Sequence, residues 1–391
     1  MVDSTIPAPL VYAPAKARKD ILSAIMTAAR QFGRETVALV DGDGTEVPYK
    51  NILRGAFGLG SAFRRMTKKD EVVGIMLPTG AGATVAFCAV LAAGRIPAMI
   101  NFSAGVTNIR SALKTANISK VVTAHKFIDL GELHPLISDL SSDAEFVYID
   151  DLREELTLKD KLSALAGPYL SWLVRRKPNH KKPAVILFTS GTEGVPKGVV
   201  LSHENIVANV EQVRAHIGLS PENDSVFNPL PAFHCFGLTV GTILPLVAGV
   251  RQICHPTPLQ PREIATRIGE TQSTLLLATD TFISQYARAS NETNLQSVRL
   301  AVCGAERVKD ETRQMVRRKF GIEILEGYGA TEAAPVVAAN SMELNKPGTV
   351  GKLMSDMEVY NNAFSSDQRT FFYPSGKGYK LNMELVSQLL S

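Results

Sequence analysis

Cysteine is scarce in this sequence, and its four copies lie far apart. Cys88, Cys235, Cys254 and Cys303 include no Cys-x-x-Cys pair. Structural zinc sites need clustered ligands, and disulfide frameworks are typical of short, cysteine-rich secreted chains. We therefore expect neither a zinc site nor a disulfide framework. Reduced thiols also fit a cytoplasmic protein.

The sequence also lacks a marked excess of charge and a long apolar run. Its 42 basic and 38 acidic residues leave a net charge of +4, which is too small to favour a nucleic-acid partner. The longest nearly apolar stretch, residues 235–250, contains Pro245 and is shorter than the roughly 20 residues of a spanning helix. No basic segment followed by an apolar one opens the chain. We expect no secretory signal, no membrane span and a cytoplasmic location.

One local cluster of positive charge stands out against this balance. Arg175, Arg176 and Lys177 are followed closely by Lys181 and Lys182. We interpret the cluster as part of a solvated linker, because charge runs usually lie in solvent. The alternative is a contact with an anion or with a lipid surface.

The length and pattern of the chain indicate an α/β protein. Its 391 residues, 45% of them hydrophobic, can bury a large core and should form more than one domain. Short β-branched runs alternate with helical patterns, which predicts lobes with largely parallel sheets. We expect a first β-α lobe over residues 1–177, a second over 178–357, and a divergent, poorly ordered tail over 358–391. Strands are expected at 72–77, 121–123, 146–149, 184–188, 275–277, 300–302 and 323–325, and helices at 83–93 and 309–319.

The most informative motif is a loop rich in glycine and hydroxyl groups. Residues 189–198 read Thr-Ser-Gly-Thr-Glu-Gly-Val-Pro-Lys-Gly and follow the apolar run 184–188. Glycine lets the backbone approach an anion closely, hydroxyl groups donate hydrogen bonds, and Lys197 adds a positive charge. The spacing matches neither a Walker A loop nor the Gly-x-Gly-x-x-Gly of dinucleotide folds. We predict a phosphate-binding loop between a strand and a helix, with ATP as its ligand; a surface turn is the alternative.

An amphipathic helix is predicted directly after this loop. Ile206, Val210, Val213 and Ile217 recur at spacings of four, three and four residues, so they share one helical face. Ser202 is suited to cap the N-terminus of this helix, because its hydroxyl can accept a hydrogen bond from a free amide of the first turn.

A second loop complements the first. Residues 326–332 read Glu-Gly-Tyr-Gly-Ala-Thr-Glu and follow another predicted strand, and parallel sheets bind ligands at the carboxyl ends of their strands. Tyr328 can stack on a purine, Thr331 can hold a carboxylate or phosphate oxygen, and Glu332 can bind the magnesium that accompanies ATP. Alone, this motif would more often be a structural turn. Combined with the first loop, it predicts a nucleotide site.

Together the two loops resemble those of the adenylate-forming superfamily, which includes acyl-CoA synthetases, luciferases and peptide-synthetase adenylation domains. Three further segments, at 100–106, 228–241 and 346–351, look like the acyl-acyl carrier protein synthetase half of bacterial bifunctional 2-acylglycerophosphoethanolamine acyltransferases. The resemblance covers roughly residues 21–357. It implies the α/β N-terminal domain of an adenylate-forming enzyme.

The resemblance assigns roles to the matching positions. It implies that ATP is bound by Thr189, Ser190, Gly191, Thr192, Gly194, Lys197, Gly304, Ala305, Glu306, Gly327, Tyr328 and Gly329. It implies catalytic roles for Lys197, His234, Thr331 and Glu332, with Mg²⁺ held by Glu332. His234 matches a histidine at the acyl-substrate site, and a packed core histidine is the alternative.

The implied reaction is the ATP-dependent activation of a fatty acid as an acyl-adenylate, followed by transfer to the phosphopantetheine thiol of acyl carrier protein. The alternatives are a fatty acyl-CoA ligase and a non-catalytic protein that binds ATP or acyl chains. A loose contact with the inner face of the bacterial inner membrane is the most that the resemblance implies about membranes.

The resemblance ends near Met357. The remaining residues contain no Thr-Gly-Asp for the ribose hydroxyls and no room for the family's C-terminal domain, which carries a catalytic lysine. We therefore expect a truncated synthetase that lacks its C-terminal domain, with catalysis impaired by that loss.

Overall fold

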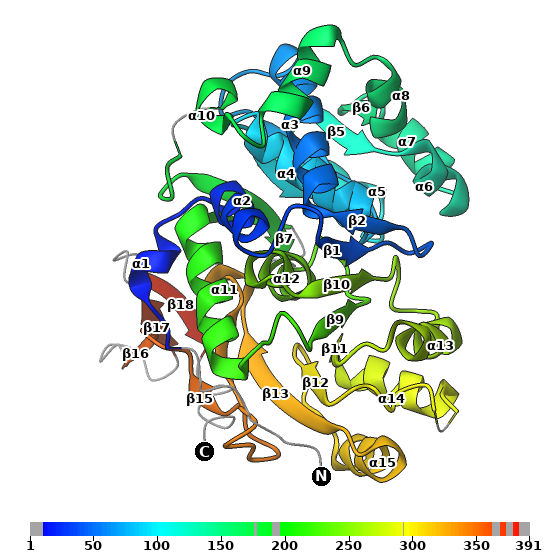
Figure 1. The fold of residues 1–391 in the computed structure, drawn as a ribbon, viewed down its shortest axis with the longest axis vertical. Helices are drawn as coiled ribbons and strands as arrows, with labels where there is room; N and C mark the ends of the chain where they lie inside the picture. The colour runs from blue at the N-terminus through cyan, green and yellow to red at the C-terminus, as the bar shows by residue number, and fades with distance from the viewer. Residues whose placement is uncertain are drawn as a thin grey trace.

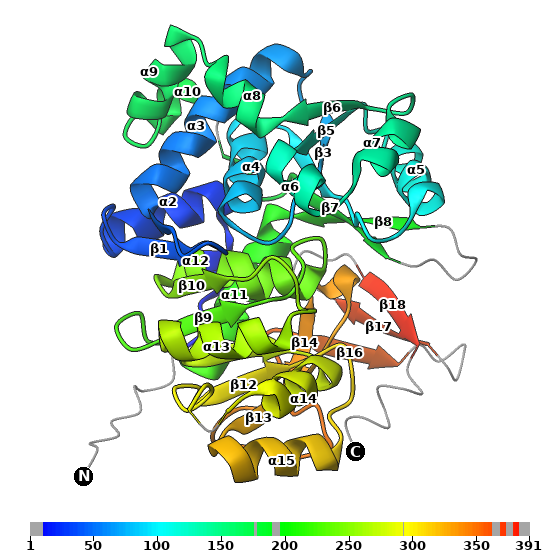
Figure 2. The same cartoon turned by 90° about the vertical axis from the view of Figure 1, so that its right-hand side faces the viewer.

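Two large sheets, with helices packed against them, make up most of the molecule (Figures 1 and 2). The computed structural model describes residues 11–175, 178–189, 196–291, 293–361, 368–372 and 378–382. Within this part of the chain, no helix is both long enough and apolar enough to cross a membrane.

The first sheet consists of β3 (Val72–Ile75), β4 (Ile96–Met99), β5 (Lys120–Thr123), β6 (Glu145–Tyr148), β7 (Pro183–Thr189) and β8 (Lys197–Ser202). Its strand order is β6-β5-β3-β4-β7-β8. Neighbouring strands are parallel, except that β7 and β8 form an antiparallel hairpin. The predicted α/β class with largely parallel sheets is confirmed.

The second sheet consists of β1 (Val37–Val40), β2 (Glu46–Pro48), β9 (Ser225–Asn228), β10 (Arg251–Cys254), β11 (Leu275–Ala278), β12 (Leu300–Cys303), β13 (Glu323–Gly329), β14 (Val336–Ala339) and β15 (Lys352–Leu353). Its order is β15-β14-β13-β12-β11-β9-β10-β1-β2. The strands from β13 to β1 are parallel. The remaining three pair antiparallel at the two edges.

Helices connect most of these strands. They are α1 (Pro14–Ala17), α2 (Ile21–Gln31), α3 (Tyr49–Met66), α4 (Ala81–Ala92), α5 (Val106–Thr115), α6 (His125–Leu130), α7 (His134–Leu140), α8 (Ile149–Glu154), α9 (Leu158–Ala166), α10 (Ser171–Val174), α11 (His203–Ile217), the π-helix η1 (Phe236–Ile243), α12 (Leu244–Ala248), α13 (Pro261–Thr271), α14 (Asp280–Ala289), α15 (Asp310–Phe320) and the 3-10 helix η2 (Thr331–Ala333). The expected helices at 83–93 and 309–319 are α4 and α15, within two residues at each end.

The two sheets do not follow the expected division of the chain at residue 178. Strands β7 and β8, which come after that point, complete the first sheet, whereas β1 and β2, near the N-terminus, extend the second. Polar, proline-bounded segments such as 178–183 indicate where the chain turns. They do not determine which strands pair, because pairing is decided by non-local contacts.

Three short strands follow the second sheet. β16 (Glu358–Asn361), β17 (Gln368–Phe372) and β18 (Gly378–Asn382) pair antiparallel as a third sheet (Figure 2). The sequence pattern indicated no regular strand here, because turn-forming residues interrupt it. The short C-terminal helix suggested by Met383, Val386 and Leu389 lies outside the described residues.

Strand β8 is a feature that the sequence pattern did not reveal. We expected the loop after residue 189 to lead directly into a helix, but the chain first returns along β7, with Lys197 opposite Thr189. The predicted phosphate loop therefore connects two antiparallel strands. The predicted helix follows as α11, and Ser202 caps it by accepting a hydrogen bond from the Asn205 amide at 3.1 Å.

Helix α11 is buried between the two sheets and joins their cores. It contacts α2, α12, β7 and β8. The predicted apolar stripe from Ile206 to Ile217 is buried, but so are Asn209, Glu211 and Gln212 on the other faces of the helix. Asn209 is satisfied by β14, since its side chain accepts a hydrogen bond from the Val336 amide at 3.0 Å and donates one to the Val336 carbonyl at 2.8 Å.

A buried carboxylate attaches α9 to α3. The side chain of Asp160 is fully buried and forms an ion pair with Arg65. It also completes a capping box with Thr157, whose hydroxyl donates to it at 2.7 Å. Burial raises the pKa of Asp160, but hydrogen bonds from Thr157, Ser61 and Arg65 outweigh this effect and lower the pKa to about 2. The carboxylate is therefore ionised in the folded chain at neutral pH.

We predict that Asp160→Asn destabilises the fold by about 2 kcal/mol at pH 7, because hydrogen bonds to a charged group are lost. The folded pKa lies below the ordinary value of 3.8. The contribution of Asp160 is therefore complete above that value and is lost as the pH falls toward about 2. Urea unfolding of both chains at pH 7 and at about pH 3 measures this difference. Glu35→Gln, which removes an exposed ion pair with Lys50, is the control, and an equal loss in both variants would contradict the prediction.

Candidate active site

A cavity of about 410 Å³ lies at the carboxyl-terminal ends of β12 and β13. Its walls come from the end of β7, the last turns of α11, η1 and the residues before it, η2 and β14. Of the site residues expected from the sequence, it brings together Thr189, His234, Gly304, Ala305, Gly327, Tyr328, Gly329, Thr331 and Glu332. Segments more than 100 residues apart in the chain therefore meet where an α/β sheet usually binds its ligand.

Strand β13 changes its partner at this cavity. Up to Glu326 it pairs with β12 in parallel, and from Gly327 onward it pairs with β14 in antiparallel register. A Cβ atom at Gly329 would lie 2.5 Å from the carbonyl oxygen of Pro335. Glycine is required there because a backbone oxygen cannot move aside as a side chain can. The Gly-Tyr-Gly motif thus lets β14 return closely enough to form one wall.

His234 is held at the cavity by the segment that leads into η1. Its Nδ1 accepts a hydrogen bond from the Phe236 amide at 3.3 Å. The turn is fixed by Asn228, whose side chain donates to the Gly237 carbonyl at 3.2 Å and accepts from the Leu230 amide at 3.1 Å. Burial lowers the pKa of His234, so the ring is neutral at physiological pH and Nε2 carries its proton.

Tyr328 and Glu332 are two of the polar groups of the wall. Burial, and then the nearby carboxylate of Glu332, raise the pKa of Tyr328, so its phenol stays neutral. Burial raises the pKa of Cys235 to about 12, which makes that thiol an apolar wall group and not a nucleophile. The tyrosine ring therefore offers a flat, uncharged surface beside a single carboxylate.

The donor set suits magnesium bound together with a nucleotide. Across the described residues, no three His, Cys, Asp or Glu side chains gather as a metal site of their own. Magnesium commonly uses one or two protein carboxylates and completes its shell with water and substrate phosphates. Glu332 supplies one such carboxylate at the cavity wall. Its role would be to hold a metal ion that neutralises phosphate charge.

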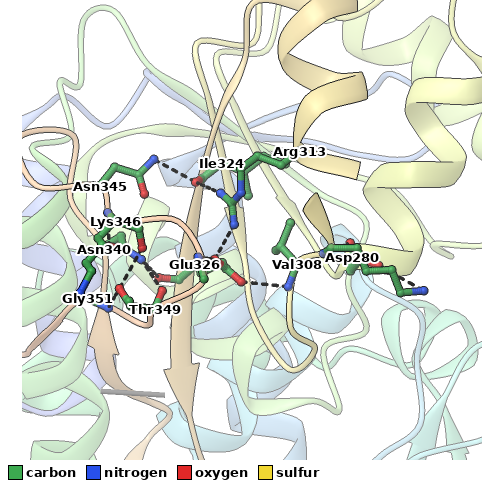
Figure 3. A network of polar contacts seen from close by, with 12 residues as sticks. Asp280, Val308, Arg313, Ile324, Glu326, Asn340, Asn345, Lys346, Thr349 and Gly351 are labelled. Carbon is green, nitrogen blue, oxygen red and sulfur yellow. Dashed lines mark hydrogen bonds and ion pairs between the residues drawn. The ribbon is translucent and has the colours of Figure 1, made fainter. Parts of the chain in front are cut away.

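A buried carboxylate at the end of the parallel part of β13 connects the walls (Figure 3). Glu326 accepts hydrogen bonds from the amides of Val308 at 2.9 Å and Gly348 at 3.0 Å, and it forms an ion pair with Arg313. The first contact holds the loop that carries Gly304 and Ala305. The second holds the segment 346–351, so one side chain links β13 to the loop that lines the cavity and to a further segment behind it.

Asn340 reinforces this arrangement (Figure 3). Its backbone amide donates a hydrogen bond to the Glu326 carbonyl at 2.9 Å. Its side chain donates one to the Thr349 carbonyl at 2.6 Å and accepts one from the Lys346 backbone amide at 3.0 Å. The asparagine is fully buried. The Lys-Pro-Gly-Thr-Val-Gly segment therefore wraps around a buried polar side chain.

Several expected site residues take other positions. The carboxylate of Glu306 accepts hydrogen bonds from the amide and hydroxyl of Thr281 at the start of α14, and it is not among the cavity walls. Lys197 is the first residue of β8, opposite Thr189 at the loop end of the hairpin, and it is not among the residues that line the cavity. Ser190, Gly191, Thr192 and Gly194 lie outside the described residues.

The apolar walls and one polar group of the cavity were not indicated by any motif of the sequence. Val213 and Ile217 line the cavity as well as the core, together with Phe236, Val240 and Val302. Helical periodicity cannot distinguish a core face from a cavity wall. His216 also lines the cavity, and its Nε2 lies 2.9 Å from the Ala339 carbonyl oxygen. Because that oxygen only accepts, Nε2 donates and ties α11 to β14.

The fold of this chain is shared with several solved structures. The crystal structure of the anthranilate CoA ligase AuaEII with anthranoyl-AMP has the same fold, with a TM-score of 0.77 and 18% identity over 92% of this chain and 70% of that one. VinN with L-aspartate gives a TM-score of 0.78 at 16% identity, covering 93% of this chain and 92% of that one.

The chain belongs to the AMP-binding enzyme family, whose pattern it matches over residues 25–361. It is 27% identical to a long-chain-fatty-acid–CoA ligase of Escherichia coli O6:H1, over 74% of this chain and 58% of that protein. It is also 27% identical to a long-chain-fatty-acid–CoA ligase of Bacillus subtilis 168, over 85% of this chain and 64% of that protein. The chain thus spans about three fifths of the length of these relatives.

We predict that Glu326→Gln destabilises the chain by about 3 kcal/mol, because it leaves Arg313 and a backbone amide without their buried acceptor. It should also weaken ATP binding, since the cavity walls would lose their common anchor. Urea unfolding and ATP titration calorimetry measure the two effects. Glu323→Gln, on the same strand, removes an exposed ion pair with Arg317 and should cost under about 1 kcal/mol. Similar losses in both variants would refute the anchoring role.

Proposed function

We propose that this chain binds ATP and a fatty acid in the cavity at the ends of β12 and β13 and joins them as an acyl-adenylate. An oxygen of the fatty-acid carboxylate attacks the α-phosphorus of ATP, and the bond to the β-phosphate oxygen breaks. Pyrophosphate leaves with the electron pair of that bond. The observation that carries the proposal is the meeting of Thr189, His234 and the 327–332 loop around one cavity.

The roles follow from the chemistry of the walls. Gly304, Ala305 and the ring of Tyr328 would receive the adenine, because they present a flat and uncharged surface. Thr331 would hold an oxygen of the α-phosphate or carboxylate, and Glu332 would hold Mg²⁺ against the phosphates. Lys197 and the loop after Thr189 would offset the charge that develops on pyrophosphate.

The apolar walls support an acyl substrate. Val213, Ile217 and Val240 are among the residues that line the cavity, and such walls take an alkyl chain without an unpaired polar group. Neutral His234 stands at this wall, where its Nε2 proton can be donated to a carboxylate oxygen. Relatives in Escherichia coli and Bacillus subtilis are named long-chain-fatty-acid–CoA ligases, which supports a fatty acid as the class of substrate.

The acceptor of the acyl group would be a pantetheine thiol, which attacks the acyl carbon and releases AMP. Segments 100–106, 228–241 and 346–351 resemble acyl carrier protein synthetases and favour a protein-borne thiol. The names of the relatives favour free CoA as the second candidate. Both acceptors present the same nucleophile, so the adenylation step does not depend on the choice.

We predict fatty-acid-dependent exchange of labelled pyrophosphate into ATP by the purified, folded chain. Glu332→Gln and Lys197→Ala should each lower the exchange rate about 100-fold, because one preorganised electrostatic contact is worth roughly 3 kcal/mol. Lys181→Ala, which changes an exposed lysine before β7, is the control and should leave the rate unchanged. A folded chain that binds ATP without exchanging pyrophosphate would instead support a non-catalytic binder.

We predict that acyl carrier protein with its phosphopantetheine arm accepts the acyl group in preference to CoA. The measurement is the rate of thioester formation with each acceptor at equal thiol concentration, starting from the preformed acyl-adenylate. Carrier protein without the arm serves as the control and should yield no thioester. A faster reaction with CoA would assign the chain to the acyl-CoA ligases.

A further inference from the structure

The turn that carries His234 connects β9 to η1 in the second sheet, but it is held by loops of the first sheet. Of the described strands of the first sheet, only β7 reaches the cavity wall, through Thr189. A second contact lies behind the wall. The hydroxyl of Thr79, in the loop between β3 and α4, donates a hydrogen bond to the Leu230 carbonyl at 2.8 Å. Both residues are buried, so this bond joins the two sheets away from solvent.

The Leu230 backbone is fixed on both sides. Its amide donates to the Asn228 side chain at 3.1 Å, and its carbonyl accepts from the threonine hydroxyl. The next carbonyl, that of Pro231, accepts a hydrogen bond from the His234 amide at 3.1 Å. A Cβ atom at Gly237 would lie 2.3 Å from this Pro231 oxygen, so η1 packs directly on the turn. A displacement at Leu230 is therefore passed on to the His234 backbone.

A row of three aromatic rings holds the same turn at a second point. Phe233, next to His234, has its ring centre 5.2 Å from that of Phe102, and the ring planes meet at 89°. Phe102 follows β4, and on its other side Phe127 of α6 lies 4.9 Å away at 68°. Edge-to-face pairs are favourable because the positive edge of one ring meets the negative face of the other. The loops after β3 and β4 thus hold the turn through a hydrogen bond and a ring contact.

We propose that Thr79 and Phe102 are positioning residues for His234. Neither is among the described residues that line the cavity, so each acts through the turn. The proposal rests on the proposed function, in which the Nε2 proton of His234 is donated to a carboxylate oxygen. Misplacing a reacting group by about 1 Å can slow a reaction about 100-fold. A donor carried by a turn therefore needs support from the structure behind it.

The test compares Thr79→Val with Thr123→Val. Thr123 is also a buried threonine, and its hydroxyl donates to the Met76 carbonyl at 3.0 Å, within the first sheet. Each variant leaves one buried carbonyl without its donor, so both should lower the stability to urea by similar amounts. Only Thr79→Val should slow fatty-acid-dependent pyrophosphate exchange, by about tenfold, with KM for ATP unchanged. Thr79→Ser keeps the hydroxyl and should restore the rate. Equal exchange rates in the two valine variants would overturn the proposal.

A His234→Ala background separates positioning from packing. Thr79→Val and Phe102→Leu should each slow exchange in the unaltered chain, but they should change the rate less than about twofold once His234 is alanine, because coupled residues are not additive. Losses of the same size in both backgrounds would contradict the proposal, since the two residues would then act on another part of the site. Circular dichroism verifies that every variant is folded.

Nitrogen NMR of the seven histidines observes the His234 ring without catalysis. Loss of a signal in His234→Ala assigns it, and the unaltered chain should show the Nε2–H tautomer, with Nδ1 accepting from the Phe236 amide. Thr79→Val should shift this signal and Thr123→Val should not. An unshifted signal in Thr79→Val would refute the positioning role. A shifted signal in a chain that exchanges no pyrophosphate would keep the positioning role and reject the proposed function.

Discussion

The candidate site depends on one buried carboxylate. Glu326 stands where β13 leaves β12 and turns to β14. A charge in such a place is costly unless every oxygen is paired. Its partners are Arg313 and the amides of Val308 and Gly348. By satisfying this carboxylate, the chain brings the loop before α15 and the segment 346–351 to the end of the same strand. Gly304 and Ala305 of that loop and Gly327 to Gly329 of that strand are walls of the cavity.

The sequence motifs indicated several side chains that line the cavity, but they did not indicate Glu326, the carboxylate that positions the surrounding segments. Tyr328, Thr331 and Glu332 could be proposed because their chemistry suits a nucleotide and they follow a predicted strand. Glu326 stands in the same motif, but its role depends on partners 13 to 22 residues away in the chain. Spacing alone does not show that these amides converge on one carboxylate. Glu306 illustrates the opposite case, because Thr281 captures its side chain.

The elements of the fold were predictable where the sequence pattern is local. β11, β12 and β13 begin at the expected residues, since apolar strand runs bounded by turns are informative by themselves. Sheet membership was not predictable, because β1 pairs with β10 and β4 pairs with β7 across large sequence separations. The hairpin of β7 and β8 was also not predictable. The run from Gly198 to Leu201 is too short to distinguish a strand from the residues that lead into a helix.

Helix α9 shows a limit of periodicity that bears on function. The spacing of Leu158, Leu162 and Leu165 gives an apolar face, and a pattern alone would assign that face to the core. The structure buries Asp160 instead, because Thr157, Ser61 and Arg65 satisfy its carboxylate at the contact with α3. Once the polar side is anchored, the leucines have no place in the core. Exposed apolar area of this kind costs free energy in water. A helix that keeps such leucines exposed, with cations around them, therefore has the character of a contact surface, because a binding partner would remove that area from water.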